Sequence, residues 1–242
     1  MGCAPYRGSA MGRSAIPSPP PAPAGSVLGL DEAGRGSLVG PLVVGGFLVD
    51  ADRIPELTGI GVRDSKRLSP ARREEIFSAL PGIGQPWVLP LPARSVDRAV
   101  RFGRLNELEL DAFAQLVRSA QPDMAFADAC DPVAERFGRR LGDASGNTCI
   151  VHARHKADRD LPVVAAASIV AKVHRDRALH RLRARLGEGL GSGYPSDRLT
   201  VAFVRESISG GGPLPSWLRA SWATTERLMR GRTARPLEAF GP

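Results

Sequence analysis

The chain has 242 residues, 43% of them hydrophobic, which suits one sizeable globular domain with a buried core. Its formal net charge of +8 favours a polyanionic partner such as nucleic acid, although charge alone says nothing about chemistry. No apolar run approaches the roughly 18–20 residues of a membrane-spanning helix, and the 3 cysteines lack metal-ligand or disulfide spacing, so we expect a cytoplasmic protein without a disulfide framework.

The first 25 residues predict a disordered tail. Residues 1–25 are rich in Pro, Ala, Gly and Ser and poor in aromatic residues, so they cannot bury enough surface to become ordered. They also lack the continuous apolar core of a signal peptide. We therefore expect ordered structure to begin near residue 26.

After this tail, short apolar runs alternate with segments of helical periodicity. Strands are expected over residues 27–31, 41–49, 87–91, 123–128 and 148–152. Helices are expected over residues 72–80, 106–119, 132–141, 162–186, 198–208 and 221–230. Because two strands come first and strand–helix alternation follows, the pattern predicts a mixed β-sheet covered by helices.

The order of these elements also suggests how the chain is divided. Nothing marks a firm interdomain linker, so we expect one α/β domain over residues 26–186. Gly- and Pro-rich breaks separate the last helices from it, which predicts a small helical C-terminal extension over residues 187–230. Residues 231–242 are expected to form a flexible tail.

The segment GLDEAGRG at residues 29–36 is the densest chemical signal. An apolar strand delivers Asp31 at its end, where a carboxylate is costly to bury unless it is paired or binds a metal. Successive strand residues face opposite sides, so we expect Glu32 to reach the same site only if the chain turns there, which Gly34 and Gly36 permit. Those glycines leave backbone N–H groups open to a phosphate or a sugar, and Arg35 adds positive charge.

Two other interpretations of this segment remain open. A dinucleotide-binding loop fits badly, because its glycines should lead into a helix and here they lead into a second apolar strand. A tight hairpin in which Asp31 forms a salt bridge would need no ligand at all.

Two further carboxylates occupy comparable positions. Asp128 ends the apolar run 124–128, and Asp158 lies in the turn before the long helix. Strands that each end in Asp can build a two-metal phosphodiester site at the carboxyl edge of a sheet. Taken alone, Asp158 fits a helix cap somewhat better than a ligand. Asp131 competes with Asp128, but we expect it to cap the helix that starts at Pro132.

Several other residues could meet nucleic acid or metal. Lys66 could contact a phosphate, and Tyr194 lies in a Gly-rich loop that suits stacking on a sugar or base, although a packed turn tyrosine is equally compatible. His155 could bind a metal or transfer a proton, but a lone His is more often structural. We expect Asp176, which lies among arginines, to form salt bridges.

Taken together, these motifs resemble ribonuclease HII, most closely its archaeal branch. The resemblance runs in order from Val27 to about Leu228. It is carried by GLDEAGRG at 29–36, RDSKRLS at 63–69, ADACD at 127–131, HKAD at 155–158, PVVAAASIVAKVHRDR at 162–177 and GSGYPSD at 191–197.

The resemblance implies a fold, an activity and a set of site residues. The fold would be a ribonuclease H-like mixed sheet flanked by helices. The activity would be endonucleolytic hydrolysis of the RNA strand of RNA–DNA hybrids and cleavage 5′ of ribonucleotides embedded in duplex DNA, leaving 5′-phosphate and 3′-hydroxyl ends. The family's catalytic metal ligands match Asp31, Glu32, Asp128 and Asp158, which would hold Mn²⁺ or Mg²⁺. Substrate contacts would come from the backbone of Gly34, Arg35 and Gly36, from Tyr194 on the ribose and from Lys66 on a phosphate.

The chain departs from the family pattern in places. Ser37 and Arg198 stand where Pro is common, and we expect little effect from Ser37. Archaeal members often end in a peptide that binds a sliding clamp. Leu237 and Phe240 have roughly suitable spacing for one, but the leading Gln and the second aromatic residue are absent. The resemblance also implies a monomer.

Two functions compete with this interpretation. Another metal-dependent nuclease on the same fold would differ only in substrate. A non-catalytic nucleic-acid-binding protein would explain the positive charge, but not carboxylates at strand ends, which repel phosphate unless metal is bound.

Overall fold

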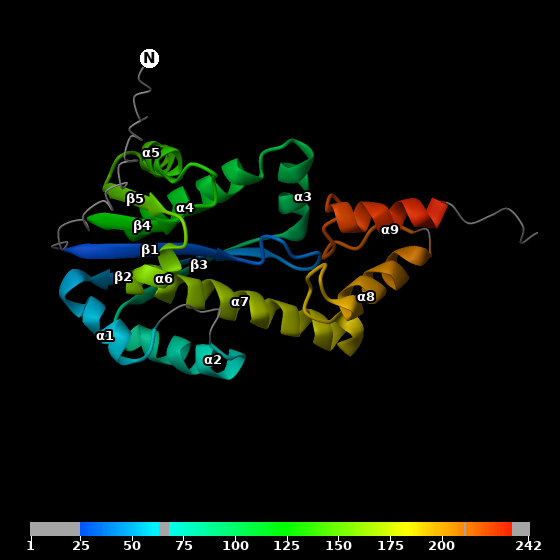
Figure 1. Ribbon diagram of the computed structural model, residues 1–242, viewed down its shortest axis with the longest axis horizontal. Helices are drawn as coiled ribbons and strands as arrows, with labels where there is room; N and C mark the ends of the chain where they lie inside the picture. The colour runs from blue at the N-terminus through cyan, green and yellow to red at the C-terminus, as the bar shows by residue number, and fades with distance from the viewer. Residues whose placement is uncertain (1–24, 63–67, 211, 234–242) are drawn as a thin grey trace, which may run out of the picture.

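A single mixed β-sheet forms the centre of the computed structural model, which describes residues 25–62, 68–210 and 212–233 (Figure 1). The strands are β1 (Ser26–Ala33), β2 (Leu42–Asp50), β3 (Gln85–Leu91), β4 (Met124–Asp128) and β5 (Ile150–Arg154), in the order β3-β2-β1-β4-β5. β2 runs antiparallel to both β1 and β3, whereas β1, β4 and β5 are parallel. The predicted mixed sheet is confirmed.

Helices cover both faces of the sheet (Figure 1). One face carries α1 (Ile54–Gly59), α2 (Pro70–Ala79), α6 (Ala157–Asp160) and the long α7 (Pro162–Leu186). The other carries α3 (Ala93–Arg101), α4 (Leu105–Ala120) and α5 (Ala134–Ala144), while α8 (Arg198–Ser209) and α9 (Ala223–Thr233) lie beyond one end of the sheet. Short 3₁₀ helices are η1 (Ala51–Arg53), η3 (Leu80–Gly82) and η4 (Glu188–Leu190). Among the described residues, no helix has the length and hydrophobicity needed to cross a bilayer.

Strand β1 is buried on both faces, and its side chains alternate between two hydrophobic clusters. Val27 packs in the cluster that α7 contributes to, whereas Leu28 and Leu30 pack in the cluster formed with α4. This alternation follows from the twofold repeat of a strand. Odd-numbered β1 residues therefore face α7 and even-numbered residues face α4.

Helix α7 packs directly on the backbone of β1 and β2. A Cβ atom on Gly29 would lie 2.1 Å from the carbonyl oxygen of Val163, and one on Gly45 would lie 2.4 Å from that of Ala167. Glycine in the strands and alanine along the facing side of α7 let the helix and the sheet approach this closely. The contact fixes the height of α7, and of α6 just before it, above the end of β1.

The segment that follows α7, called the C-terminal extension below, pairs through its backbone with the loop between β1 and β2. Leu218 forms an antiparallel bridge with Val39 in the loop between β1 and β2. Arg219 N donates to the Leu38 carbonyl at 2.8 Å, and Gly40 N donates to the Trp217 carbonyl at 2.9 Å. A third hydrophobic cluster spans this contact, formed by Leu38, Val39, Leu179, Leu190, Val204, Ile208 and Leu218. The loop at 34–40 is thus held between the sheet and the extension.

Candidate functional site

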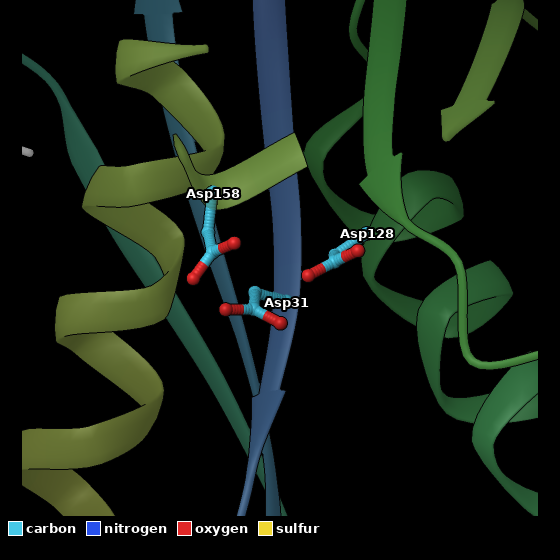
Figure 2. A group of neighbouring side chains, drawn as sticks. All are labelled: Asp31, Asp128 and Asp158. Atoms are coloured by element: carbon cyan, nitrogen blue, oxygen red, sulfur yellow. The ribbon is translucent and has the colours of Figure 1, made fainter. Parts of the chain in front are cut away.

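Three carboxylates meet at the carboxyl end of β1 and β4 (Figure 2). Asp31 comes from β1, Asp128 from the last residue of β4 and Asp158 from α6. Each offers one oxygen, and these oxygens all lie within 4.8 Å of one another. Asp158 is only 1% exposed. Carboxylate oxygens at this spacing are the hard ligands that Mg²⁺ and similar cations prefer, so the donor set fits a divalent metal.

The strand register explains why two of these side chains meet. β1 and β4 are parallel, and the last pair in their register is Leu30 with Ala127. Asp31 and Asp128 are the next residues of their strands, so both carboxylates emerge at the same edge of the sheet. This is where ligands bind in open α/β sheets.

Asp128 also positions the segment that carries Asp158. Its Oδ1 accepts a hydrogen bond from the backbone N–H of Lys156 at 2.7 Å. Lys156 has a left-handed backbone with φ of 58°, which turns the chain from β5 into α6. The N-cap residue of α7 is Leu161, and no side chain caps this helix by a hydrogen bond. Asp158 therefore does not cap the long helix.

Glu32 is the next residue of β1 after Asp31. The strand continues to Ala33 and the chain turns at Gly34, where φ is +84°, so the turn that Gly34 and Gly36 permit comes just after Glu32. By strand alternation Glu32 starts on the α4 side, and its carboxylate is not one of the three that meet, although the side chains of Glu32 and Asp31 interact. The charges of Glu109 and Asp128 act on the Glu32 carboxylate, because the pairing of β1 with β4 ends before Glu32.

Crowding of these acids raises their pKa values. Burial raises the pKa of Asp31 well above its ordinary value and Glu32 adds to the rise, while Lys172 and a hydrogen bond from Ser168 oppose it. Burial, then Glu109 and Asp128, raise the pKa of Glu32 to about 7. A bound divalent cation would relieve this repulsion.

We expect the metal-free protein to lose stability as the pH rises from about 4.5 to about 7 because of Glu32. In that window the folded protein keeps a proton that the unfolded chain has already released, so rising pH favours unfolding. Thermal unfolding in chelator across the window measures this, with Glu32→Gln as the reference. The wild type should lose melting temperature relative to Glu32→Gln as the pH rises, and saturating Mg²⁺ should reduce the difference. Parallel curves in chelator would contradict the prediction.

The side chain of Arg35 turns inward from the loop at 34–40. Its Nε donates to both oxygens of Glu109, at 2.9 and 3.0 Å, and its Nη2 donates to Oδ1 of Asn106 at 2.6 Å. Glu109 is fully buried on α4. The positive charge expected to meet a ligand is therefore paired with a carboxylate, and Gly36 is the exposed residue of the segment 34–36.

Glu109 and Asn106 were missed by the sequence analysis. The one signal was that Glu109 lies four residues before Phe113 on a helix, and so on the buried face of α4. A carboxylate on an apolar face requires a partner, although the sequence does not say which.

Tyr194 lies beside this loop. The Leu38 N–H and the Ser37 hydroxyl both donate to the Gly193 carbonyl, at 2.7 and 2.8 Å. Arg175 on α7 donates to the Ser37 hydroxyl at 3.3 Å, and its guanidinium carbon lies 4.5 Å from the centre of the Tyr194 ring. Ser37, where relatives were expected to have Pro, thus joins the two loops through a hydroxyl that Pro lacks.

Asp131, Asp176 and His155 lie outside the carboxylate group. Asp131 accepts from Val133 N at 2.9 Å and pairs with Arg136, but the N-cap of α5 is Val133, without a side-chain cap bond, so the predicted cap at Asp131 is wrong. Asp176 forms the predicted salt bridges, with Arg73 and Arg175. The ring nitrogens of His155 lie 3.3 Å from the carbonyl oxygens of Ala129 and Pro132. Lys66 lies outside the described residues.

Comparison with known proteins gives consistent matches. The family model described as Ribonuclease HII matches residues 28–225. Ribonuclease HII of Methanothrix thermoacetophila is 44% identical over 84% of this chain and 96% of that protein. The crystal structure of ribonuclease H2 from Pyrococcus horikoshii superposes with a TM-score of 0.81 at 37% identity, over 87% of this chain and all of that one (100%). The structure described as the PCNA:RNase HII complex from Archaeoglobus fulgidus has a TM-score of 0.75 at 38% identity, over 88% of this chain and 100% of that one. The predicted fold is confirmed.

Proposed function

Since the chain belongs to the ribonuclease HII family, we propose that it cuts 5′ of single ribonucleotides embedded in duplex DNA, leaving 5′-phosphate and 3′-hydroxyl ends. Family membership makes it a metal-dependent endoribonuclease with ribonuclease H activity on RNA–DNA hybrids. The observation that carries the proposal is the meeting of three carboxylates at one sheet edge, on the strand that leads into the loop at 34–40.

The catalytic acids proposed are Asp31, Asp128 and Asp158, with Glu32 beside them. Two divalent cations, Mg²⁺ or Mn²⁺, would bind these carboxylates and, when bound, would activate water and stabilise the leaving 3′ oxygen. Glu32 would complete the set of metal ligands from the α4 side, because its carboxylate interacts with both Asp31 and Asp128. The carboxylates themselves hold the charge that attracts the cations and fix where the phosphate must lie.

Selection of ribose is assigned to the loops beside the carboxylates. Backbone groups of Gly34, Arg35 and Gly36 would hydrogen-bond the 2′-hydroxyl, which distinguishes RNA from DNA without reading bases. The Tyr194 ring would stack on the ribose, and the guanidinium of Arg175 packs against this ring. Lys66, in the segment outside the described residues, would contact a phosphate.

A sliding clamp is a proposed partner. The Archaeoglobus fulgidus relative is described as a complex with PCNA, and it is 38% identical to this chain. We assign the contact to the tail at 231–242, where Leu237 and Phe240 have roughly suitable spacing. Residues 234–242 lie outside the described part of the chain. The enzyme is proposed to act as a monomer.

Cleavage of a DNA duplex that contains one ribonucleotide tests the function. We expect a cut 5′ of the ribonucleotide with Mg²⁺ or Mn²⁺, and none in chelator, because the carboxylates repel phosphate without cations. Product ends are identified by denaturing gels against markers with 5′-phosphate and 3′-hydroxyl termini.

Two controls define the substrate. The all-DNA duplex of the same sequence should stay intact, and a uniform RNA–DNA hybrid should be cut. Cleavage of all-DNA would indicate a DNA nuclease on the same fold. Binding without any cleavage under either metal would indicate a non-catalytic nucleic-acid-binding protein.

A further inference from the structure

Arg219 is a fully buried arginine in the segment between α8 and α9, with 0% exposure. Its Nη1 donates to the Arg35 carbonyl at 2.8 Å, and its Nε and Nη2 both donate to the Gly40 carbonyl at 3.2 Å. The Trp222 ring centre lies 5.1 Å from its guanidinium carbon. Burial, reinforced by Arg175, lowers the pKa of Arg219 to about 10, so the guanidinium stays charged at neutral pH.

A buried cation is a costly way to fill this space. Removing a guanidinium from water is unfavourable, and an apolar side chain of similar volume often serves stability as well or better. The hydrogen bonds of Arg219 go to backbone carbonyls at two points of the loop at 34–40. What the charged group contributes is therefore control over the path of that loop.

The bond to the Arg35 carbonyl has a geometric consequence for Gly36. The peptide between Arg35 and Gly36 is trans and planar, so the Gly36 N–H points away from the Arg35 carbonyl. Because Arg219 holds the carbonyl toward the protein interior, the N–H of the exposed Gly36 points outward. A donor at this position suits recognition of a ribose hydroxyl, provided that its direction is fixed.

We propose that Arg219 is a positioning residue for ribose recognition: it locks the Arg35–Gly36 peptide so that the Gly36 N–H faces the substrate. This inference rests on the proposed function of residues 34–36. It places the ribose specificity of the enzyme under the control of the C-terminal extension, because Arg219 belongs to the segment that pairs with the loop.

The test compares Arg219→Met and Arg219→Lys with a matched control. Met keeps the length and removes every donor, whereas Lys keeps the charge but cannot bridge two carbonyls as a planar guanidinium does. The control is Arg118→Met, because Arg118 also donates to a backbone carbonyl, that of Ala144, but at the far end of α4. Two quantities are measured: kcat/KM on the duplex with one ribonucleotide, and affinity for the all-DNA duplex in chelator.

Arg219→Met should lower kcat/KM roughly 100-fold, the usual cost of misplacing a reacting group by about 1 Å. Its affinity for all-DNA should change by less than about threefold, and Arg118→Met should stay within about twofold in both measurements. Arg219→Lys should fall between the wild type and Arg219→Met. The split between cleavage and all-DNA binding is the sign of lost ribose recognition.

The inference is overturned by a folded Arg219→Met that cleaves like Arg118→Met, or by equal losses of cleavage and all-DNA affinity. If Arg219→Met does not fold, Arg219→Lys decides, and its full activity would overturn the inference. A wild type that never cuts would refute the proposed function itself, whereas an active wild type with an equally active Arg219→Met refutes only the role of Arg219.

Discussion

Replacing Asp31 with Asn should abolish cleavage and make the metal-free protein more stable. Loss of a carboxylate that holds catalytic cations removes several kcal/mol of transition-state stabilisation, a fall of about 10³-fold or more in kcat/KM. Burial and Glu32 raise the pKa of Asp31 well above its ordinary value, so the ionised carboxylate destabilises the empty site. Asn has nearly the same shape without the charge. The opposite signs of the two effects distinguish a metal-binding acid from a structural one.

Asp131→Asn is the matched control for this prediction. Asp131 is also a buried carboxylate, in the loop that follows β4, but it bonds Val133 N and Arg136 and lies outside the group of three. Its replacement should lower stability by about 1 kcal/mol and leave kcat/KM within about threefold. Steady-state cleavage with Mg²⁺ and thermal unfolding at neutral pH in chelator provide the two readouts. Full activity in Asp31→Asn would remove Asp31 from the site.

Gly45→Ala should destabilise the fold strongly although it adds one methyl group. The new Cβ would lie 2.4 Å from the Ala167 carbonyl oxygen and 2.7 Å from Ala171 N, both backbone atoms of α7. Since a helix backbone cannot yield locally as a side chain can, α7 must move away from the sheet. We expect a loss of about 3 kcal/mol or more in the free energy of unfolding. Activity should also fall, because α7 continues from α6, which carries Asp158.

Gly46→Ala provides the comparison, in the same strand but on the opposite face. Its Cβ would lie 3.2 Å from the Trp87 Cβ and 3.4 Å from a terminal methyl of Leu116. Small side-chain shifts relieve contacts of this length, so the loss should stay near 1 kcal/mol. Urea unfolding of both variants measures the difference. Equal losses would show that the packing of α7 on β2 is not the cause.

The sequence predicted the layers of the fold because periodicity reports burial. The bounds of α7 agree with the prediction of 162–186, since Pro162 starts the helix and Gly187 follows its end. The strands were found because their residues alternate or are continuously apolar. By contrast, α3 was missed because only Ala93 and Val96 are buried on it, and α6 was missed because it is four residues long.

The candidate site was predictable where it follows from strand ends. Asp31 lies near the end of β1 and Asp128 ends the parallel neighbouring strand β4, and Asp158 was a candidate from its place before α7. The orientation of Arg35 was not predictable, because its partner Glu109 is 74 residues away in the chain. Arg219 gave no signal either, since an arginine in an irregular segment is normally exposed and its partners are backbone carbonyls.

The pairing of residues 38–40 with 217–219 also sets an order of events during translation. The bond from Arg219 to Gly40 spans 179 residues, so at synthesis rates of about 5–20 residues per second Arg219 emerges roughly 10–40 s after the loop that it holds. By then the strands and carboxylates have already left the ribosome. On the proposed role of Arg219, selectivity for ribose is acquired after the carboxylate site, and a chain stalled before residue 217 carries the acids without the backbone pairing that holds the loop.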